Sequence, residues 1–347
     1  MKAAQLTGWR EPLALVDLPD PVAGAGGVVL KVLACGVCRS DWHAWVGADP
    51  DVILPHVPGH EFCGEVVEVG AGVTRWKAGD RVIAPFILAC GQCPDCAAGN
   101  QTICASQQVP GFTIPGAFAE AIAVPHADHN LTALPDGIEP ALAAGLGCRV
   151  TTAWHALTGR AALRPGEWLA VFGGGGVGTA VLLLGRALGA RVVVVDVVEE
   201  KLRYAKGLGA DAVVNATKVD AAGAVREITG GGADLAVEAL GIEATVVGAM
   251  KSLRKLGRMV MVGMPAGSHV NMTLPMDAVY SGQLAFFGTR GMPAWRYPSL
   301  LNLIEGGQVD LSPLVTRHIG LSGATAELAA FDAPAPPGVA VITDFTG

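Results

Sequence analysis

One stretch in the middle of the chain constrains its fold more than any other. The apolar run Trp168–Phe172 leads into a cluster of glycines, and a segment with helical periodicity, Val177–Leu188, follows the cluster. A second apolar run, Arg191–Val195, then ends at an acidic residue, Asp196. This order predicts a strand, a tight turn, a helix and a second strand parallel to the first.

The glycines of this turn have a spacing that suits a bound dinucleotide. Gly173, Gly175 and Gly178 fit G-x-G-x-x-G. The first glycine permits a tight turn, the second lets a pyrophosphate approach the backbone, and the third lets the helix pack on the strand. Asp196 follows Gly178 by 18 residues, about where an acid meets the ribose hydroxyls. We interpret the turn as a dinucleotide site, and a purely structural glycine turn is the alternative.

The rest of the chain divides into two kinds of pattern. Residues 1–33 and 62–88 alternate apolar and polar residues with Pro and Gly breaks, so the first 150 or so residues are predicted to be mostly β. From about residue 168, apolar runs alternate with helical segments, which predicts an α/β, doubly wound parallel sheet. The six runs lie at 168–172, 191–196, 212–214, 234–237, 258–262 and 284–287.

Composition excludes several classes of function. The 347 residues carry a net charge of −7, which argues against a nucleic-acid partner. The first residues contain no signal-peptide pattern, and charged residues interrupt the most apolar segment, 177–198, so no membrane partner is expected. We expect a cytoplasmic protein, in which eight cysteines favour metal binding over disulfides.

Four of the cysteines form a compact group with the spacing C-x2-C-x2-C-x7-C. They are Cys90, Cys93, Cys96 and Cys104. Four soft ligands within 15 residues can enclose a tetrahedral Zn²⁺ without help from elsewhere in the chain. We interpret the group as a structural zinc site, and a set of buried or redox-active thiols is the alternative.

A second group of metal-binding residue types is scattered along the chain. A catalytic zinc takes three protein ligands and keeps one position open for water or substrate. The candidates are Cys38, Asp41, His43, His60, Glu61 and Cys148. Spacing alone does not favour Cys148 over Cys35 or Cys63, because a single cysteine in an apolar stretch is more often a small buried hydrophobic residue.

These motifs together resemble the zinc-containing alcohol dehydrogenases of the medium-chain dehydrogenase/reductase superfamily. The motifs GHEFCGEVVEVG, CGVCRSD, GGGGVG and VVVVD and the four-cysteine lobe occur in the family's order and spacing. The resemblance implies a β-rich, GroES-like catalytic domain (residues 1–149 and 287–347) with the zinc lobe at about 88–106. It also implies a Rossmann NAD-binding domain at 150–286. The short chain is similar to the bacterial branch, whose members are often tetramers, so we expect a homo-oligomer.

The resemblance also assigns the metal ligands and the catalytic residues. Cys38, His60 and Cys148 would bind the catalytic zinc, with Glu61 just behind it, and Asp41 would orient His60. Ser40 would take the proton of the alcohol and pass it through the nicotinamide ribose towards His43. Cys35 and Cys63 match no ligand position and are expected to be packing thiols.

The cofactor and substrate residues follow from the same resemblance. Asp196 and Lys201 would hold the adenosine ribose, Thr152 would pack against the nicotinamide, and Arg39 would reach the pyrophosphate. The backbone around Val262 and Met264 would meet the carboxamide, and Gly176 and Val177 would complete the phosphate turn. Phe86, with Trp45, would line the alcohol pocket, whose shape depends on loops 45–57, 110–116 and 264–297.

The implied reaction is the reversible oxidation of a primary or secondary alcohol to an aldehyde or ketone, with hydride transfer to NAD⁺. Zinc would act as a Lewis acid. Two alternatives remain. The first is a zinc-free relative of the quinone-reductase type, and the second is a non-enzymatic regulatory protein that binds a dinucleotide.

One position departs from the family pattern. The family's C-terminal strand usually carries an arginine that grips the pyrophosphate and pairs with the acid behind the zinc, but here Val339 stands at the matching place. No Arg or Lys follows Arg317. We therefore expect Glu61 to lack its usual partner and NAD to bind more loosely, unless Arg290 or backbone N–H groups compensate.

Overall fold

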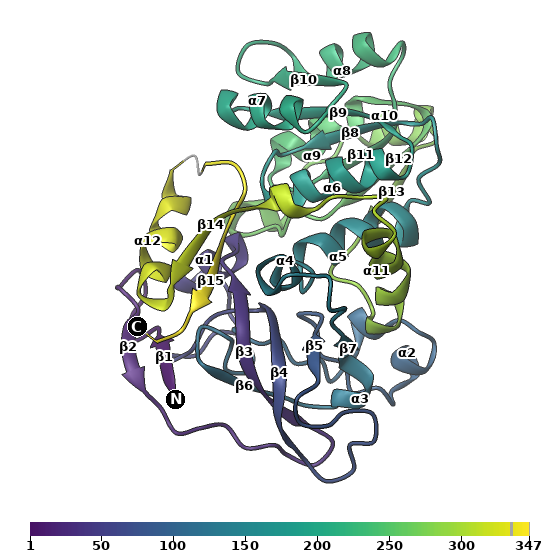
Figure 1. The fold of residues 1–347 in the computed structure, drawn as a ribbon. Helices are drawn as coiled ribbons and strands as arrows, with labels where there is room; N and C mark the ends of the chain where they lie inside the picture. Colours follow the sequence, from purple (N-terminus) through teal and green to yellow (C-terminus); the bar gives the residue numbers. More distant parts are fainter. Residues whose placement is uncertain (334–335, 347) are drawn as a thin grey trace.

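The computed structural model describes residues 1–333 and 336–346 and contains two large sheets of different kinds (Figure 1). The upper sheet in that view is entirely parallel, with its strands in the order β10-β9-β8-β11-β12-β13. The strands are β8 (Trp168–Phe172), β9 (Arg191–Asp196), β10 (Ala212–Asn215), β11 (Ala233–Glu238), β12 (Leu253–Met261) and β13 (Ala285–Gly288). The predicted doubly wound sheet is confirmed.

Both faces of the central strands of this sheet are buried, which explains why those strands are continuous apolar runs. Along β8, Leu169 and Val171 belong to one hydrophobic core and Ala170 and Phe172 to another. Because successive side chains of a strand point to opposite faces, the two cores lie on the two sides of the sheet. The helices of this half are α6 (Gly176–Ala187), α7 (Glu199–Gly207), α8 (Ala221–Thr229), α9 (Glu243–Lys251) and α10 (Met276–Gly282).

The lower sheet in Figure 1 is mostly antiparallel and has the order β14-β15-β3-β4-β5-β7, with β6 also paired to β3. Its strands are β3 (Val28–Gly36), β4 (Glu61–Val69), β5 (Arg81–Ile83), β6 (Ala121–Val124), β7 (Thr132–Ala133), β14 (Val315–Gly320) and β15 (Val339–Asp344). A small antiparallel pair precedes them, β1 (Lys2–Gln5) and β2 (Ala14–Asp17). β15, near the C-terminal end of the described residues, therefore pairs with β3, near the N-terminal end, and Val341 lies opposite Gly36.

The helices of the lower half are short, and three of them, α1, α2 and α5, begin directly after a candidate cysteine ligand. They are α1 (Arg39–Trp45), α2 (Pro94–Ala97), α3 (Ala127–Asn130), α4 (Pro140–Gly145), α5 (Arg149–Trp154), α11 (Tyr297–Glu305) and α12 (Ala324–Ala329). A π-helix, His155–Arg160, continues α5 towards the parallel sheet. Within the described residues, no helix has the length and apolar character needed to cross a membrane.

We propose the domain division expected from the sequence, with one adjustment. Residues 1–149 would form the catalytic domain together with the C-terminal segment, and residue 150 would begin the dinucleotide-binding domain. The expected boundary at 286/287 falls inside β13, which is hydrogen-bonded to β12 in the parallel sheet. We therefore move the proposed boundary to the end of β13, at Gly288.

Candidate metal centres and active site

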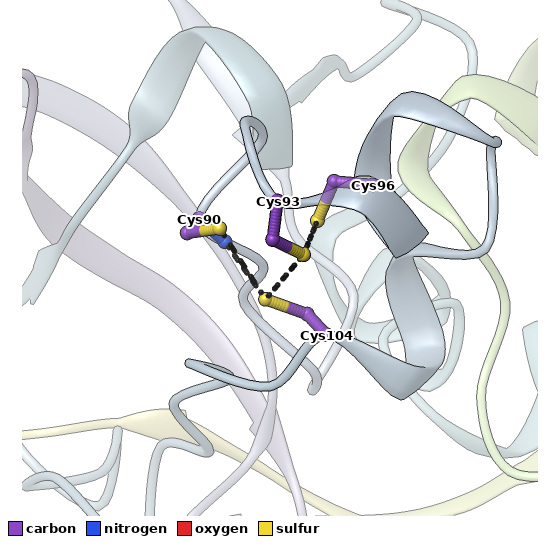
Figure 2. A group of neighbouring side chains, drawn as sticks. All are labelled: Cys90, Cys93, Cys96 and Cys104. Atoms are coloured by element: carbon purple, nitrogen blue, oxygen red, sulfur yellow. Dashed lines mark hydrogen bonds between the residues drawn. The ribbon is translucent and has the colours of Figure 1, made fainter.

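The four lobe cysteines converge in space as their spacing predicts (Figure 2). The loop from Cys90 and the short helix α2 bring Cys93 and Cys96 together, and the chain returns at Cys104. The Sγ atoms of Cys93 and Cys96 are 3.4 Å apart, those of Cys93 and Cys104 3.8 Å, and those of Cys104 and Cys90 3.5 Å. All four are free thiols, since a disulfide would need a sulfur separation of about 2.05 Å.

These separations fit one tetrahedral zinc ion. Ligand sulfurs at about 2.3 Å from a tetrahedral Zn²⁺ lie about 3.8 Å from one another. The observed range of 3.4–3.8 Å is close to that value, so ion binding would need only small shifts. The lobe therefore has the donor atoms and the geometry of a closed structural site.

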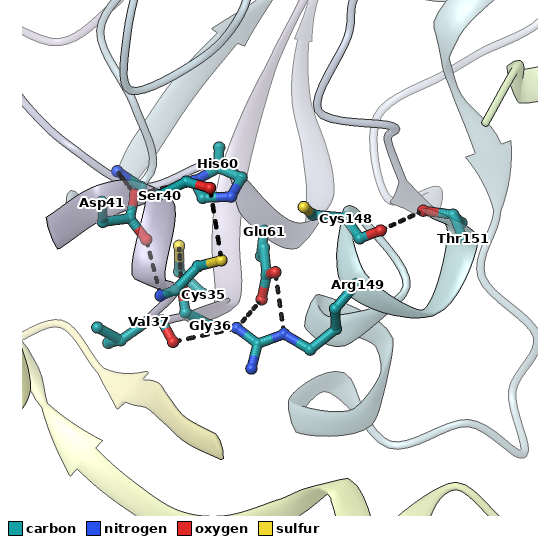
Figure 3. A network of polar contacts seen from close by, with 12 residues as sticks. Cys35, Gly36, Val37, Ser40, Asp41, His60, Glu61, Cys148, Arg149 and Thr151 are labelled. Carbon is teal, nitrogen blue, oxygen red and sulfur yellow. Dashed lines mark hydrogen bonds and ion pairs between the residues drawn. The ribbon is translucent and has the colours of Figure 1, made fainter. Parts of the chain in front are cut away.

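A second cluster lies where β3, β4 and α5 meet (Figure 3). The ligand atoms of Cys38, His60, Glu61 and Cys148 all lie within 4.8 Å of one another. Cys38 follows β3 and caps α1, His60 immediately precedes β4, and Cys148 caps α5. The fold thus selects Cys148 over Cys35 and Cys63, which belong to no metal-binding group among the described residues.

Asp41 fixes the positions of Cys38 and His60 through hydrogen bonds. Its fully buried carboxylate accepts hydrogen bonds from the backbone N–H of Cys38 (2.9 Å) and of Gly59 (3.2 Å). The third contact, 2.9 Å long, joins Asp41 Oδ1 to Nδ1 of His60. An ionised carboxylate only accepts, so His60 carries its proton on Nδ1 and directs the lone pair of Nε2 outward.

Two related features of the cluster fit a metal ion. His60 Nε2 is buried and has no hydrogen-bond partner among the described residues, which is costly unless a ligand binds it. The pKa of Cys38 is held well below its ordinary value, first by a hydrogen bond from Cys148 and also by His60, although burial opposes the shift. The protein alone therefore favours a thiolate, the form that binds zinc.

Glu61 has an arginine partner, contrary to the expectation from the sequence. Arg149, the first residue of α5, donates from Nε to Glu61 Oε1 at 2.9 Å and from Nη2 to Oε2. Burial raises the pKa of Glu61 above its ordinary value, and the charge of Arg149 limits that rise. Burial also tends to lower the pKa of Arg149, but Glu61 outweighs it and the net shift is upward. We assign both groups as ionised, because each stabilises the charge of the other.

The glycine turn after β8 has the geometry that its spacing predicts. Gly173 has φ +108°, a conformation that favours glycine. A Cβ on Gly178 would lie 1.7 Å from the carbonyl oxygen of Gly173, so only glycine lets α6 start this close to the turn. A Cβ on Gly175 would meet nothing within 4 Å, which leaves open space at the position expected to face the pyrophosphate. The residues present therefore fit a dinucleotide.

Asp196 ends β9 beside this turn and also stabilises it. Its Oδ2 accepts from the N–H of Gly174 at 2.6 Å, and its Oδ1 accepts from the N–H groups of Val197 (2.8 Å) and Val198 (2.9 Å). Lys201 lies on the same side, with its Cβ 3.3 Å from a Cβ built on Gly174. The carboxylate retains acceptor capacity on Oδ2, since one oxygen has two acceptor positions.

The other expected cofactor residues have varied surroundings. Thr152 is buried on α5, and its Oγ1 has no partner among the described residues, as expected of a group that meets a ligand. Val262 follows β12 and donates its N–H to the carbonyl of Glu238 at 2.8 Å, whereas Met264 is exposed. Arg39 donates to the carbonyl of Phe331, so its contact with pyrophosphate stays a prediction.

Ser40 and His43 lie on one face of α1, three residues apart. Ser40 Oγ is 3.9 Å from Cys38 Sγ, which puts the hydroxyl beside the metal cluster. His43 Nδ1 is buried without a partner among the described residues. No hydrogen bond joins the two side chains within the described part of the chain, so a relay between them would need a bridging hydroxyl.

Aromatic residues form one wall of the cluster. The ring of Phe86 lies 5.8 Å from that of His60, and the ring of Phe112 lies 5.4 Å from it. The loop 110–116 is predictable from the sequence as part of the pocket, but Phe112 is not, because a single aromatic in an irregular loop has no periodic signal. Trp45 lies against the N-terminal segment instead, with Nε1 2.6 Å from the carbonyl of Glu11, so its role in the pocket stays a prediction.

The fold and the two clusters together define a dinucleotide-binding zinc oxidoreductase with two domains, and comparison with known proteins narrows the class. A family model for the alcohol dehydrogenase GroES-like domain matches residues 24–136, and a model for zinc-binding dehydrogenases matches residues 176–306. The chain belongs to the zinc-containing alcohol dehydrogenases of the medium-chain superfamily. The resemblance seen in the sequence is thereby confirmed, including its two cofactors, zinc and NAD.

Individual relatives cover most of the chain. An alcohol dehydrogenase of Geobacillus stearothermophilus is 40% identical over 76% of this chain and 78% of its own length. An NAD-dependent alcohol dehydrogenase of Sulfolobus acidocaldarius is 34% identical over 93% and 94%. An L-threonine 3-dehydrogenase of Streptomyces coelicolor is 34% identical over the full length of both chains. The crystal structure of an alcohol dehydrogenase from Thermus sp. ATN1 matches with a TM-score of 0.91 at 30% identity, covering 99% of this chain and 100% of that one.

Proposed function

We propose that the protein oxidises a primary or secondary alcohol reversibly to an aldehyde or ketone, with hydride transfer to NAD⁺. The observation that carries the proposal is the buried Nε2 of His60, which has no partner among the described residues and lies within 4.8 Å of the sulfurs of Cys38 and Cys148. A zinc ion held by Cys38, His60 and Cys148 supplies Lewis-acid chemistry, because it lowers the pKa of a bound hydroxyl group.

The surrounding residues would orient the metal site and move the proton. Asp41 keeps His60 in the tautomer that leaves Nε2 free to bind. Ser40, beside the cluster, accepts the proton of the alcohol. Burial, and then the charge of Arg39, lower the pKa of His43, so its ring is neutral at pH 7 and can receive that proton in turn.

The substrate class rests on the walls of the cluster. The aromatic rings of Phe86 and Phe112 next to His60 support an apolar substituent on the alcohol. Relatives of similar identity include an L-threonine dehydrogenase and a D-arabitol-phosphate dehydrogenase, whose names point to charged substrates. We propose simple alcohols over those two classes, because an apolar wall would leave a buried charge unpaired.

NADH absorbance with a panel of alcohols tests this proposal. Aliphatic and benzylic alcohols should give the highest kcat/KM, well above threonine and sugar phosphates. Cys148→Ser should abolish turnover, whereas the matched variant Cys63→Ser should keep it, since Cys63 donates only to the carbonyl of Pro140. Reduction of a quinone without zinc, or dinucleotide binding with no turnover of any alcohol, would favour one of the two alternatives.

We also propose that the protein assembles as a homo-oligomer, with a tetramer favoured, in the cytoplasm. Strand β13 is the edge of the parallel sheet, and the apolar side chains of Phe286, Tyr280 and Met276 nearby are exposed. An exposed apolar edge strand is unfavourable unless another chain covers it. Light scattering should give more than one chain per particle, and Phe286→Lys should shift the distribution towards monomer.

The proposed cytoplasmic location rests on the cysteines, because sets of reduced cysteine ligands suit a reducing compartment.

A further inference from the structure

The family resemblance gives no role to Arg149. It is the first residue of α5, directly after Cys148, and is 4% exposed. Two of its three nitrogens are committed: Nε and Nη2 both donate to Glu61, and Nη2 also donates to the carbonyl of Val37 at 3.0 Å (Figure 3). A guanidinium has five N–H donors, so two remain on Nη1.

The remaining nitrogen, Nη1, faces the start of α6. A Cβ built on Gly176, the first residue of that helix, would lie only 2.8 Å from it. Nη1 has no hydrogen-bond partner among residues 1–333 and 336–346. The unpartnered nitrogen of an arginine that is only 4% exposed is therefore directed at the glycine turn.

The N-terminus of α6 points donors into the same space. The N–H groups of Gly176, Val177 and Gly178 precede the first intrahelical bond, which Thr179 N–H makes to the carbonyl of Gly175. The positive end of a helix and a buried cation repel each other, unless an anion lies between them. Both sets of donors would be satisfied by one anionic group, and arginine suits phosphate because its N–H groups are fixed in a plane.

We infer that Arg149 binds the pyrophosphate of NAD through Nη1 and links it to Glu61 beside the metal cluster, an inference that rests on the proposed function. Val339 supports it. Val339 lies on β15, and its Cγ2 would be 3.3 Å from the same Cβ on Gly176. The last strand therefore presents an apolar side chain to the start of α6. Arg149 supplies the positive charge there from α5. We therefore no longer expect weak binding of NAD, because Arg149 supplies the charge from α5 that Val339 cannot supply from β15.

Calorimetric titration of the zinc-loaded protein with ADP-ribose and with adenosine tests the inference. ADP-ribose contains the pyrophosphate and adenosine does not. Arg149→Met should weaken ADP-ribose binding about 10- to 100-fold, as expected for one charged hydrogen bond or a pair of them, and leave adenosine binding within about twofold. Adding Val339→Arg to Arg149→Met should restore much of the loss, because the charge returns to the same place from β15.

Two further variants control for damage to the fold. Arg149→Met leaves Glu61 as a buried, unpaired acid, so Arg149→Met/Glu61→Gln removes both charges and should lose ADP-ribose affinity to the same extent. Arg317→Met breaks an ion pair with Glu327 elsewhere and should bind both ligands like the wild type.

The outcomes separate this inference from the proposed function. Unchanged ADP-ribose affinity in folded Arg149→Met protein would overturn the inference alone. Equal weakening of ADP-ribose and adenosine would also overturn it, since it would reveal a purely structural role. Wild-type protein that binds neither ligand would overturn the proposed function, and the inference with it.

Discussion

Replacing Asp41 with Asn tests whether one buried carboxylate orients the catalytic ligand. Asp41 accepts three contacts, from the N–H groups of Cys38 and Gly59 and from His60 Nδ1. An amide offers one oxygen and one NH₂, so in either orientation a donor faces a donor. If the oxygen serves Gly59 and His60, the NH₂ opposes the N–H of Cys38. If the amide flips, the NH₂ meets His60 and favours the wrong tautomer.

The structure sets the size of the effect. The lost charged hydrogen bond and the orphaned buried N–H together cost about 2–4 kcal/mol of folding free energy. Loss of such an orienting partner typically reduces metal affinity about 10- to 100-fold. Asp41→Asn should therefore lower the melting temperature and release one zinc per chain at a chelator concentration about 10- to 100-fold lower than the wild type, while the lobe zinc stays bound.

The assay is dialysis against increasing chelator, with zinc per chain counted by atomic emission. Asp128→Asn is the matched control, because Asp128 also accepts backbone N–H groups, from Thr74 (2.9 Å) and Arg75 (3.0 Å), but lies in neither metal-binding cluster. Zinc-release curves for Asp41→Asn that superimpose on the wild type would refute the orienting role. A lowered melting temperature on its own would then mean that Asp41 only holds the backbone.

Three other predictions concern the metal, the cofactor and the proton. The wild type should contain two zinc ions per chain and lose activity with the first one removed, since the lobe has four protein ligands and the catalytic site three; one zinc in fully active protein would contradict this. NAD should be preferred over NADP, and Asp196→Gly should erode the ratio of kcat/KM for the two cofactors, because a 2′-phosphate would meet the carboxylate. Asp196→Asn can keep part of the hydrogen bonding to the glycine turn, so this variant controls for loosening of the turn. Equal use of NAD and NADP by the wild type would exclude a role of Asp196 in cofactor choice. Ser40→Ala should slow alcohol oxidation about 10²- to 10⁴-fold with little change in NADH affinity, and His43→Gln should do less because water can replace it; near-normal turnover of Ser40→Ala with chemistry rate-limiting would remove the relay.

The parts of the fold with a local signal could be predicted from the sequence. β8 and β9 begin and end where their apolar runs do, because strands buried on both faces are apolar throughout. β12 is predicted at 258–262 but begins at Leu253, because the charged Arg254 and Lys255 and the following Leu256 are exposed and leave no continuous apolar run. The first part of β12 is a strand because its backbone pairs with β11, and the pattern of side chains in the sequence does not show such pairing.

The candidate site shows the same limit. The lobe cysteines could be assigned from spacing because their ligands are local. Arg149 could not be assigned, since its partner Glu61 is 88 residues away and no pattern tells which way a single arginine points. The Val339 substitution was visible in the sequence, but the expectation that Glu61 would lack a partner was wrong, because Arg149 pairs with it from α5, an element far from the C-terminus.

The position of β15 beside β3 also sets the order in which the protein can be completed during synthesis. The six strands of the parallel sheet are contiguous between residues 168 and 288, so that domain can fold as soon as its own residues have emerged from the ribosome. β3, whose end leads to Cys38, can pair with β4 and β6 once residue 124 has emerged, and it gains its pairing with Val341 and Ile342 only later. The four lobe cysteines need only the first 104 residues, so the structural zinc can bind early. The three candidate ligands of the catalytic zinc, Cys38, His60 and Cys148, also precede the parallel sheet in the sequence, so the donor residues of both metal sites are available before that sheet can form.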